Sequence, residues 1–266
     1  MSGGATRVSI LGATGSIGAS AAAVIGQTGG AFAVEAVVGG RNVEALARRA
    51  IELKARCAAI FDESAYPTLK SALSGSGVEP MAGLSGVCEA AARPADRVVA
   101  AITGIAGLEP TCAALRQGGV VALANKESMV SAGKAVMALA RKHGATILPL
   151  DSEHNSVFQA LGGAPIETVE KIVLTASGGP FRTWPREKIA AASRAEALRH
   201  PNFAMGAKIS VDSATMMNKG LELIEAVHLF GVPEAQVEVL VHPQQAIHGM
   251  VVFRDGSLNA GMATPD

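Results

Sequence analysis

The chain has 266 residues, which allows one large domain or two smaller ones. Apolar residues make up 49% of it and charged residues 17%, so it can bury a large core and is not a disordered protein. Basic and acidic residues number 23 each, and this neutral balance argues against a protein that tracks a nucleic-acid backbone. The three cysteines are far apart, which argues against a disulfide framework or a thiolate zinc site.

An uncharged stretch at residues 8–34 superficially imitates a signal peptide or a membrane-spanning helix. Six glycines interrupt it, whereas a spanning helix needs about 20 predominantly apolar residues. We therefore expect a soluble, cytoplasmic protein that contacts neither a membrane nor nucleic acid.

Short β-branched runs alternate with Ala- and Leu-rich segments over the first 150 residues. The predicted strands are Arg7–Leu11, Phe32–Val38, Ala58–Phe61, Arg97–Ile102, Val120–Ala124 and Thr146–Leu148. The clearest predicted helices are Asn42–Lys54, Leu108–Gln117 and Glu127–His143. Apolar strands separated by helices predict an α/β fold, with a Rossmann-like, doubly wound parallel sheet covered on both faces.

The pattern changes near residue 150. Pro149 cannot donate to a sheet ladder and is predicted to end the sixth strand. One strong helix is predicted after it, at Ala214–Leu229. The extended runs that follow are Val237–Val241, Met250–Phe253 and Leu258–Met262. We therefore expect a first domain over residues 1–150 and an α+β domain over residues 151–266.

A glycine-rich turn links the first strand to the next helix. Gly12, Gly15 and Gly18 follow a GxxGxxG spacing, a variant of the dinucleotide-binding fingerprint. They suit a tight turn, a close approach to a pyrophosphate and close helix–strand packing, although an ordinary tight turn is the alternative. Arg41 stands where an NAD site usually has an acidic residue. It favours the 2′-phosphate of NADP, the alternative being a solvated loop arginine.

Three carboxylates suggest a metal site. Asp151 and Glu153 follow the sixth strand, and in extended chain their side chains would point the same way and suit Mg²⁺ or Mn²⁺. Glu222 lies on the predicted helix, with Asn218 about 40° and Lys219 about 60° away on opposite sides of it. Such a face suits a metal-held substrate with a phosphate or hydroxyl groups. Acidic loop residues and a polar stripe that merely face water are the alternatives.

Six segments spread over nearly the whole chain carry a more specific signature. They are Leu11–Gly18, Ala124–Ser128 (ANKES), Leu150–Gln159 (LDSEHNSVFQ), Thr175–Phe181 (TASGGPF), His200–Gly206 (HPNFAMG) and Lys208–Glu222 (KISVDSATMMNKGLE). Together they closely resemble the 1-deoxy-D-xylulose 5-phosphate reductoisomerases, NADPH enzymes of isoprenoid synthesis.

The resemblance implies site residues and ligands. NADPH would contact Thr14, Gly15, Ser16, Ile17, Gly40, Arg41, Asn42, Asn125, Glu127 and Gly206. A divalent cation (Mg²⁺ or Mn²⁺, with Co²⁺ as a further option) would bind Asp151, Glu153 and Glu222. A small phosphorylated sugar would contact Lys126, Ser152, Glu153, Ser177, His200, Ser213, Asn218, Lys219 and Glu222. Its phosphate would be held by Ser177, Ser213, Asn218 and Lys219. Lys126 and Glu153 would be catalytic, handling or orienting protons.

The implied reaction is the isomerisation and reduction of 1-deoxy-D-xylulose 5-phosphate to 2-C-methyl-D-erythritol 4-phosphate. The metal would act as a Lewis acid, the carbon skeleton would rearrange by a retro-aldol/aldol or ketol route, and NADPH would deliver hydride. The first domain would then bind NADPH, the second would be catalytic, and we expect a homodimer.

Two departures from the family are expected to matter. Phe203 stands where the family usually has a tryptophan in a lid, so we expect altered closure. Family members continue beyond the position of Asp266 into a C-terminal helical domain, so we expect a chemically complete but less well supported site.

Two other functions stay open. An NADP-dependent semialdehyde dehydrogenase can begin with a similar turn, but it needs a nucleophilic cysteine in its second domain, and every cysteine here precedes residue 113. The other is an inactive NADPH-binding fragment of a reductoisomerase.

Overall fold

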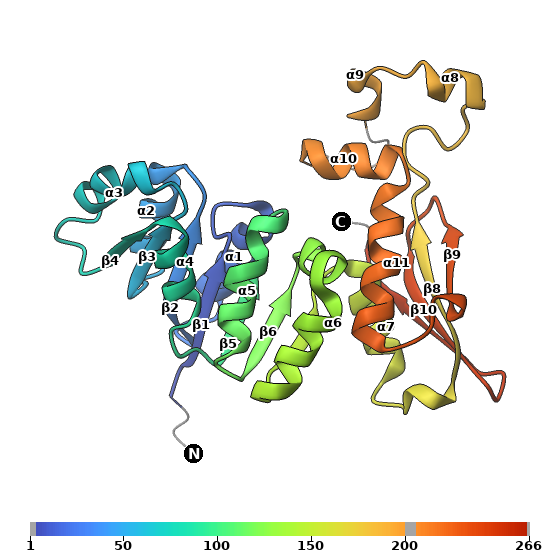
Figure 1. Cartoon of the computed structure of the whole chain (residues 1–266), viewed down its shortest axis with the longest axis horizontal. Coiled ribbons are helices and arrows are strands. Elements are labelled where there is room, and N and C mark those ends of the chain that lie inside the picture. Colours follow the sequence, from blue (N-terminus) through green and yellow to red (C-terminus); the bar gives the residue numbers. More distant parts are fainter. Residues whose placement is uncertain (1–3, 200–205, 265–266) are drawn as a thin grey trace. The chain divides into compact units, whose positions relative to one another are not determined.

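A computed structural model describes residues 4–199 and 206–264 of the chain (Figure 1). The chain divides into two compact units, residues 1–150 and residues 151–266. Among the described residues, no helix combines the length and the apolar character that crossing a bilayer requires.

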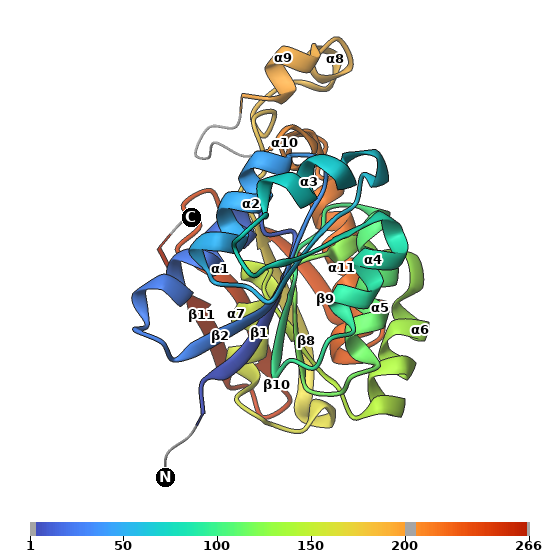
Figure 2. The same ribbon diagram turned by 90° about the vertical axis from the view of Figure 1, so that its left-hand side faces the viewer.

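The first unit is a seven-stranded parallel sheet with helices on both faces. Its strands are β1 (Thr6–Leu11), β2 (Phe32–Gly39), β3 (Cys57–Ile60), β4 (Glu79–Ala82), β5 (Arg97–Ala100), β6 (Val120–Leu123) and β7 (Thr146–Pro149). Its α-helices are α1 (Ser16–Gln27), α2 (Val43–Glu52), α3 (Tyr66–Ala72), α4 (Gly83–Ala91), α5 (Leu108–Leu115) and α6 (Lys126–His143). Figure 2 shows α1 and α2 on one side of the strands and α4, α5 and α6 on the other.

The strand order β4-β3-β2-β1-β5-β6-β7 confirms the expected Rossmann-like, doubly wound fold. The order reverses between β1 and β5, and sheets of this kind bind ligands at the carboxyl ends of the strands at such a reversal. Residues 34–39 of β2 are all buried, which explains why this run is almost uniformly apolar: helices cover it from both faces.

Only β4 of these seven strands is missing from the sequence prediction. Its sequence, EPMA, contains proline, glutamate and alanine, all of which are depleted in strands. Proline is tolerated here because β4 is an edge strand that pairs with one neighbour only. The N–H that Pro80 lacks is therefore not needed on the unpaired side of the strand. Pro149 consequently ends the seventh strand rather than the sixth, at the opposite edge of the sheet.

The second unit is a four-stranded mixed sheet covered by helices. Its strands are β8 (Val169–Ala176), β9 (Val237–Val241), β10 (Ile247–Phe253) and β11 (Leu258–Met262), in the order β11-β10-β8-β9. Only the β8–β9 pair is parallel. Its α-helices are α7 (Ser152–Leu161), α8 (Arg186–Ala190), α9 (Arg194–Ala197), α10 (Ala207–Ala214) and α11 (Met217–Phe230). The helix α7 packs on β8, β10 and β11, and α11 packs on β8 and β9.

One prediction for the second unit is wrong, and another has a shifted boundary. The residues after Asp151 are not extended, because α7 begins at Ser152. The helix predicted over Ala214–Leu229 is confirmed as α11, but it begins three residues later, after Met216, whose φ of +59° is left-handed. Methionine favours helices and this conformation is costly for any residue but glycine, so no residue type signals the break.

We predict that the contact between β11 and α7 has no room for an added methyl group. A Cβ atom at Gly261 would lie 2.4 Å from the Cβ of Ser156. Gly261→Ala should therefore lower the free energy of unfolding by about 1–3 kcal/mol, as overpacking does elsewhere. Gly26→Ala in α1 is the control, because that position has open space and should gain up to about 1 kcal/mol. Denaturant unfolding that shows no difference between the two variants would contradict this packing.

Candidate functional site

The turn after β1 brings three backbone segments into close contact. Gly12 has a φ of +93°, and a Cβ there would lie 2.4 Å from the carbonyl oxygen of Ala101, in the segment after β5. A Cβ at Gly18 would lie 2.3 Å from the carbonyl oxygen of Gly12. Both positions therefore require glycine, one for its conformation and the other for close approach of α1 to the turn.

The start of α1 is suited to an anion. Gly15 is its N-cap residue, and no described side chain caps it or places an acidic group in its first turn. The first amides of the helix, which belong to Ser16, Ile17 and Gly18, have no intrahelical acceptor. Free amides and the positive end of the helix dipole favour a phosphate at this point.

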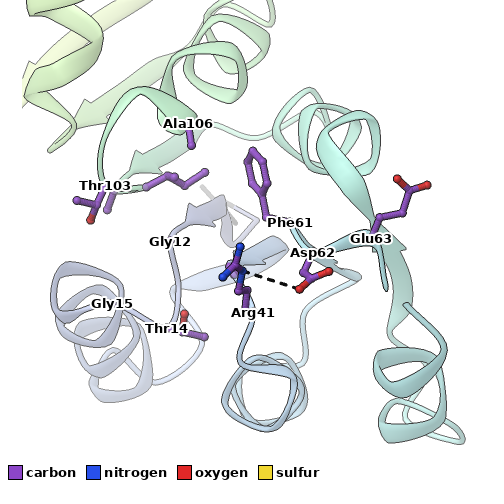
Figure 3. Close-up of a pocket in the computed structure, with 13 residues that line it drawn as sticks. Gly12, Thr14, Gly15, Arg41, Phe61, Asp62, Glu63, Thr103 and Ala106 are labelled. Carbon is purple, nitrogen blue, oxygen red and sulfur yellow. Dashed lines mark ion pairs between the residues drawn. The ribbon is translucent and has the colours of Figure 1, made fainter. Parts of the chain in front are cut away.

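A cavity of about 590 Å³ opens in front of this turn (Figure 3). Its lining comes from the segments after β1, β2, β3 and β5, on both sides of the strand-order reversal, and comprises Gly12, Thr14, Gly15, Gly39, Gly40, Arg41, Phe61, Asp62, Glu63, Ala101, Ile102, Thr103 and Ala106. Four of these, Thr14, Gly15, Gly40 and Arg41, were expected to contact NADPH, and Gly12 was expected in the glycine-rich turn. The lining residues after β3 and β5 were not predicted, because only the folded sheet brings them beside the turn.

Arg41 offers an exposed cation at this cavity. Its side chain is 90% exposed, and its Nε lies 3.9 Å from an oxygen of Asp62, as the dashed line in Figure 3 marks. Hydrogen bonds from Ser64 hold the pKa of Asp62 below its ordinary value, and the charge of Arg41 adds to the effect. The next residue, Asn42, caps α2 by accepting a hydrogen bond from the amide of Ala45 at 2.9 Å.

Asn125 ties the start of α6 to the segment after β5. Its Oδ1 accepts from the amide of Ser128 at 2.9 Å, and its Nδ2 donates to the carbonyl oxygens of Ile102 at 2.6 Å and Gly104 at 2.9 Å. Nδ2 also lies 3.2 Å from Glu127 Oε2. The buried Asn125 therefore shapes one wall of the cavity through backbone contacts.

Lys126, Gly206 and His200 are further residues that the resemblance assigned to the site. Lys126 is the buried first residue of α6 in the first unit. Gly206 precedes α10 in the second unit and is exposed. His200 and Phe203 lie outside the described residues.

The second unit gathers three carboxylates, Asp151, Glu153 and Glu222, which we call the carboxylate cluster. One oxygen of each lies within 4.8 Å of the others. Asp151 is the N-cap residue of α7, Glu153 lies in its first turn, and Glu222 lies on α11. The expected extended geometry is thus wrong, yet the helix start still presents the first two carboxylates to Glu222.

A buried lysine compensates the charge of the cluster. Lys219 Nζ donates to Glu153 Oε1 at 2.8 Å and also donates to Glu222 Oε2. Ser152 Oγ donates to Glu153 Oε2 at 2.8 Å, and Asn218 Nδ2 donates to Glu222 Oε1. Burial by itself would lower the pKa of Lys219, but the charges of Glu222 and Glu153 outweigh that effect and raise it.

His154, on α7, and Glu225, on α11, lie next to the cluster and were not predicted as functional residues. His154 Nε2 lies 2.8 Å from the main-chain oxygen of Glu222 and must donate to it, because a carbonyl only accepts. Its Nδ1 lies 3.5 Å from Glu225 Oε2 and 3.9 Å from Asp151 Oδ2. The spacing of Glu222 and Glu225, three residues apart on one helix, is the sequence signal that could have pointed to this group.

The donor set fits a hard divalent cation. Carboxylate oxygens are the ligands that Mg²⁺ and Mn²⁺ prefer. Two oxygens on one Mg²⁺ ion can lie at most about 4.2 Å apart, twice the metal–oxygen distance. The three oxygens lie within 4.8 Å of one another, which is close to this limit.

Two serines expected to bind phosphate lie on neighbouring segments. Ser177 is buried, and its Oγ accepts from the amide of Gly179 at 3.1 Å. A Cβ at Gly179 would lie 2.4 Å from the carbonyl oxygen of Ser213, so the loop after β8 packs closely on the end of α10. Ser213 in turn precedes the start of α11, which carries Asn218 and Lys219.

The cysteines show no sign of nucleophilic activation. All three lie in the first unit, and burial raises the pKa of Cys57 to about 11. Burial also raises the pKa values of Cys88 and Cys112. A nucleophilic cysteine needs the opposite shift.

Comparisons with known proteins give a consistent result. Residues 8–133 match the family model described as 1-deoxy-D-xylulose 5-phosphate reductoisomerase, and residues 147–230 match that of the C-terminal domain of the same enzyme. The reductoisomerase of Rhodospirillum centenum is 54% identical over 99% of this chain, and that of Afipia carboxidovorans is 54% identical over 100%. The chain spans 65% of the length of each of these two relatives.

Solved structures of reductoisomerases are similar over almost the whole chain. The Zymomonas mobilis enzyme in complex with NADPH superposes with a TM-score of 0.93 at 50% identity, covering 98% of this chain and 68% of that one. A reductoisomerase in complex with NADPH, fosmidomycin and magnesium superposes with a TM-score of 0.92 at 43% identity, covering 98% of this chain and 67% of that one.

We predict that Asn125 stabilises the first unit. Asn125→Ala should lower the free energy of unfolding by about 2 kcal/mol, because it removes a helix cap and leaves two part-buried carbonyl groups without this donor. Asn42→Ala, which removes only a cap, should cost about 1 kcal/mol. If denaturant unfolding found the two losses equal, the described contacts of Asn125 with the segment after β5 would contribute nothing.

Proposed function

Because this chain belongs to the 1-deoxy-D-xylulose 5-phosphate reductoisomerase family, we propose that it isomerises and reduces 1-deoxy-D-xylulose 5-phosphate to 2-C-methyl-D-erythritol 4-phosphate. Residues 1–150 bind NADPH in this proposal, and residues 151–266 bind a divalent cation and the substrate. The observation that carries it is the convergence of Asp151, Glu153 and Glu222, from two helices, on one hydrogen-bonded cluster.

The first unit supports the assignment of the cofactor. The amides at the start of α1 bind the pyrophosphate, and Gly12 and Gly15 let the backbone approach it. Arg41 pairs with the 2′-phosphate that distinguishes NADPH from NADH. NADPH, when bound, supplies the hydride of the reduction. Asn42 and Asn125 contribute by fixing the segments that border the cavity, as their capping hydrogen bonds support.

The second unit supports the assignment of the metal and the substrate. Asp151, Glu153 and Glu222 hold the cation, which when bound supplies Lewis acidity at the carbonyl and hydroxyl oxygens of the substrate. His154 orients Glu222 through its main-chain oxygen, as the 2.8 Å contact supports.

Phosphate binding and proton transfer fall to further residues. Ser177, Ser213, Asn218 and Lys219 provide hydrogen-bond donors for the phosphate. Lys126 and Glu153 orient or move protons during the rearrangement. His200, from the motif HPNFAMG, is proposed as a substrate contact on the resemblance alone.

The alternative of a semialdehyde dehydrogenase is less well supported. That chemistry needs a cysteine thiolate beside a base. Burial raises the pKa of each cysteine here, and each lies in the first unit, away in sequence from the carboxylate cluster. A homodimer is also proposed on the resemblance alone, and a cytoplasmic location is proposed because the widely spaced cysteines fit a reducing compartment.

We predict that the purified chain oxidises NADPH only when 1-deoxy-D-xylulose 5-phosphate and Mg²⁺ or Mn²⁺ are both present. Glu222→Gln should lower turnover by more than about a hundredfold, because it removes one negative ligand from the cluster. NADPH affinity, measured by fluorescence titration, should stay within about twofold, since Glu222 lies in the other unit. Glu238→Gln, at an exposed glutamate on β9, is the matched control and should leave turnover unchanged.

The outcomes separate the candidate functions. NADPH binding without turnover in the unmodified chain would favour the fragment alternative. Turnover that needs no divalent ion would exclude the metal assignment. Equal loss of turnover and NADPH binding in Glu222→Gln would show that Glu222 does not act at a metal site.

We also predict that Arg41 discriminates between the two nicotinamide cofactors. Arg41→Met should weaken NADPH binding about 10- to 100-fold, the worth of a charge-assisted hydrogen bond to phosphate, and leave NADH binding unchanged. Arg48→Met on α2, another exposed arginine, is the control and should alter neither affinity. If Arg41→Met weakened both cofactors equally, Arg41 would not be the residue that recognises the 2′-phosphate.

A further inference from the structure

Lys219 is a buried cation that forms ion pairs with two members of the carboxylate cluster. Its side chain is 6% exposed, and its ammonium joins Glu153, on α7, to Glu222, on α11. Lysine is rarely buried unless it is paired. Here the pairing partners are two of the three carboxylates proposed to hold the metal.

The carboxylate oxygens of Glu153 and Glu222 are already engaged as acceptors. Lys219 donates to one oxygen of each. The remaining oxygen of Glu153 accepts from Ser152, and the remaining oxygen of Glu222 accepts from Asn218. Each carboxylate has about four lone-pair sites, so a divalent ion can share an oxygen with a neutral donor, but it would meet the ammonium of Lys219 at close range.

Electrostatics select Lys219 as the donor that leaves. Three carboxylates with side chains between 1% and 15% exposed repel one another and need a nearby positive charge. An ammonium and a divalent cation both meet that need, but placing both against the same oxygens would bring like charges together. Ser152 and Asn218 are neutral and can stay.

We propose that Lys219 is the resident cation of the carboxylate cluster and that a divalent cation binds there by displacing its ammonium from Glu153 and Glu222. This inference rests on the proposed metal site. It also reconciles two assignments of Lys219, because the displaced ammonium becomes available to the phosphate of the substrate. Lys219 then couples the two ligands: whatever draws it away from the carboxylates favours the cation, and the reverse also holds.

The test compares Mn²⁺ affinity in two lysine-to-methionine variants of the full chain. Lys219→Met keeps a long apolar side chain but removes the competing charge, so Mn²⁺ should bind about tenfold more tightly or better than in the unmodified chain. Lys171→Met is the matched control, because Lys171 donates to Glu238 at the same 2.8 Å on the exposed surface. Its Mn²⁺ affinity should not change. Free Mn²⁺ measured by electron paramagnetic resonance gives each affinity without reference to turnover.

Thermal unfolding with and without Mn²⁺ gives an independent readout. Loss of Lys219 leaves the carboxylates mutually repelling, so the variant should unfold at a lower temperature without metal and gain more from Mn²⁺ than the unmodified chain does. If the variant is unfolded without metal, Mn²⁺ should restore its circular dichroism spectrum.

Several results would overturn the inference, and they differ from those that overturn the proposed function. Equal or weaker Mn²⁺ binding by Lys219→Met, while the unmodified chain binds Mn²⁺, would make Lys219 a structural support rather than a competitor. Failure of Mn²⁺ to restore an unfolded variant would have the same meaning. If neither the unmodified chain nor the variant bound Mn²⁺, the metal site and this inference would both fail.

Discussion

The contact between α7 and α11 determines the chemistry available to the second unit. It places Asp151 and Glu153 beside Glu222, within a region where carboxylates lose much of their hydration. Such a group persists only if each negative charge finds a compensating donor or cation. Lys219 and the neutral donors around it meet this need in the structure, and His154 connects the two helices through the backbone of Glu222.

The site of the first unit depends on close backbone packing rather than on charge compensation. Its site is made of backbone, so the limiting factor is how closely segments can approach. Gly12 and Gly18 remove the Cβ atoms that would separate the turn from α1 and from the segment after β5. Two side chains near the cavity then supply charge and rigidity. Arg41 is exposed and positive. Asn125 is buried and donates hydrogen bonds to backbone carbonyl oxygens. One unit presents amides and a guanidinium, the other mostly carboxylates.

Sequence reasoning worked best where a single segment carries the signal. The parallel sheet follows from apolar strands alternating with helices, and the turn at Gly12 follows from a strand, a glycine motif and a helix in order. It failed at β4, an edge strand with an unusual composition, and at α7, whose first turn reads equally well as a loop. The left-handed Met216 also went unnoticed, because that residue type favours a continuous helix. These errors concern elements whose conformation is set by neighbours distant in the chain.

Residue types and their order alone determined the fold class of the first unit and the identity of the family, because periodicity and motifs are local properties of the chain. The tertiary structure alone decided which side chains share a site. Phe61 and Asp62 join the cavity because β3 ends beside β2, which in turn pairs with β1. His154 and Glu225 lie close to Asp151 because side chains of α7 and α11 contact one another. The partner of Lys219 on α7 was equally out of reach, since a pairing between helices depends on packing that no local pattern records.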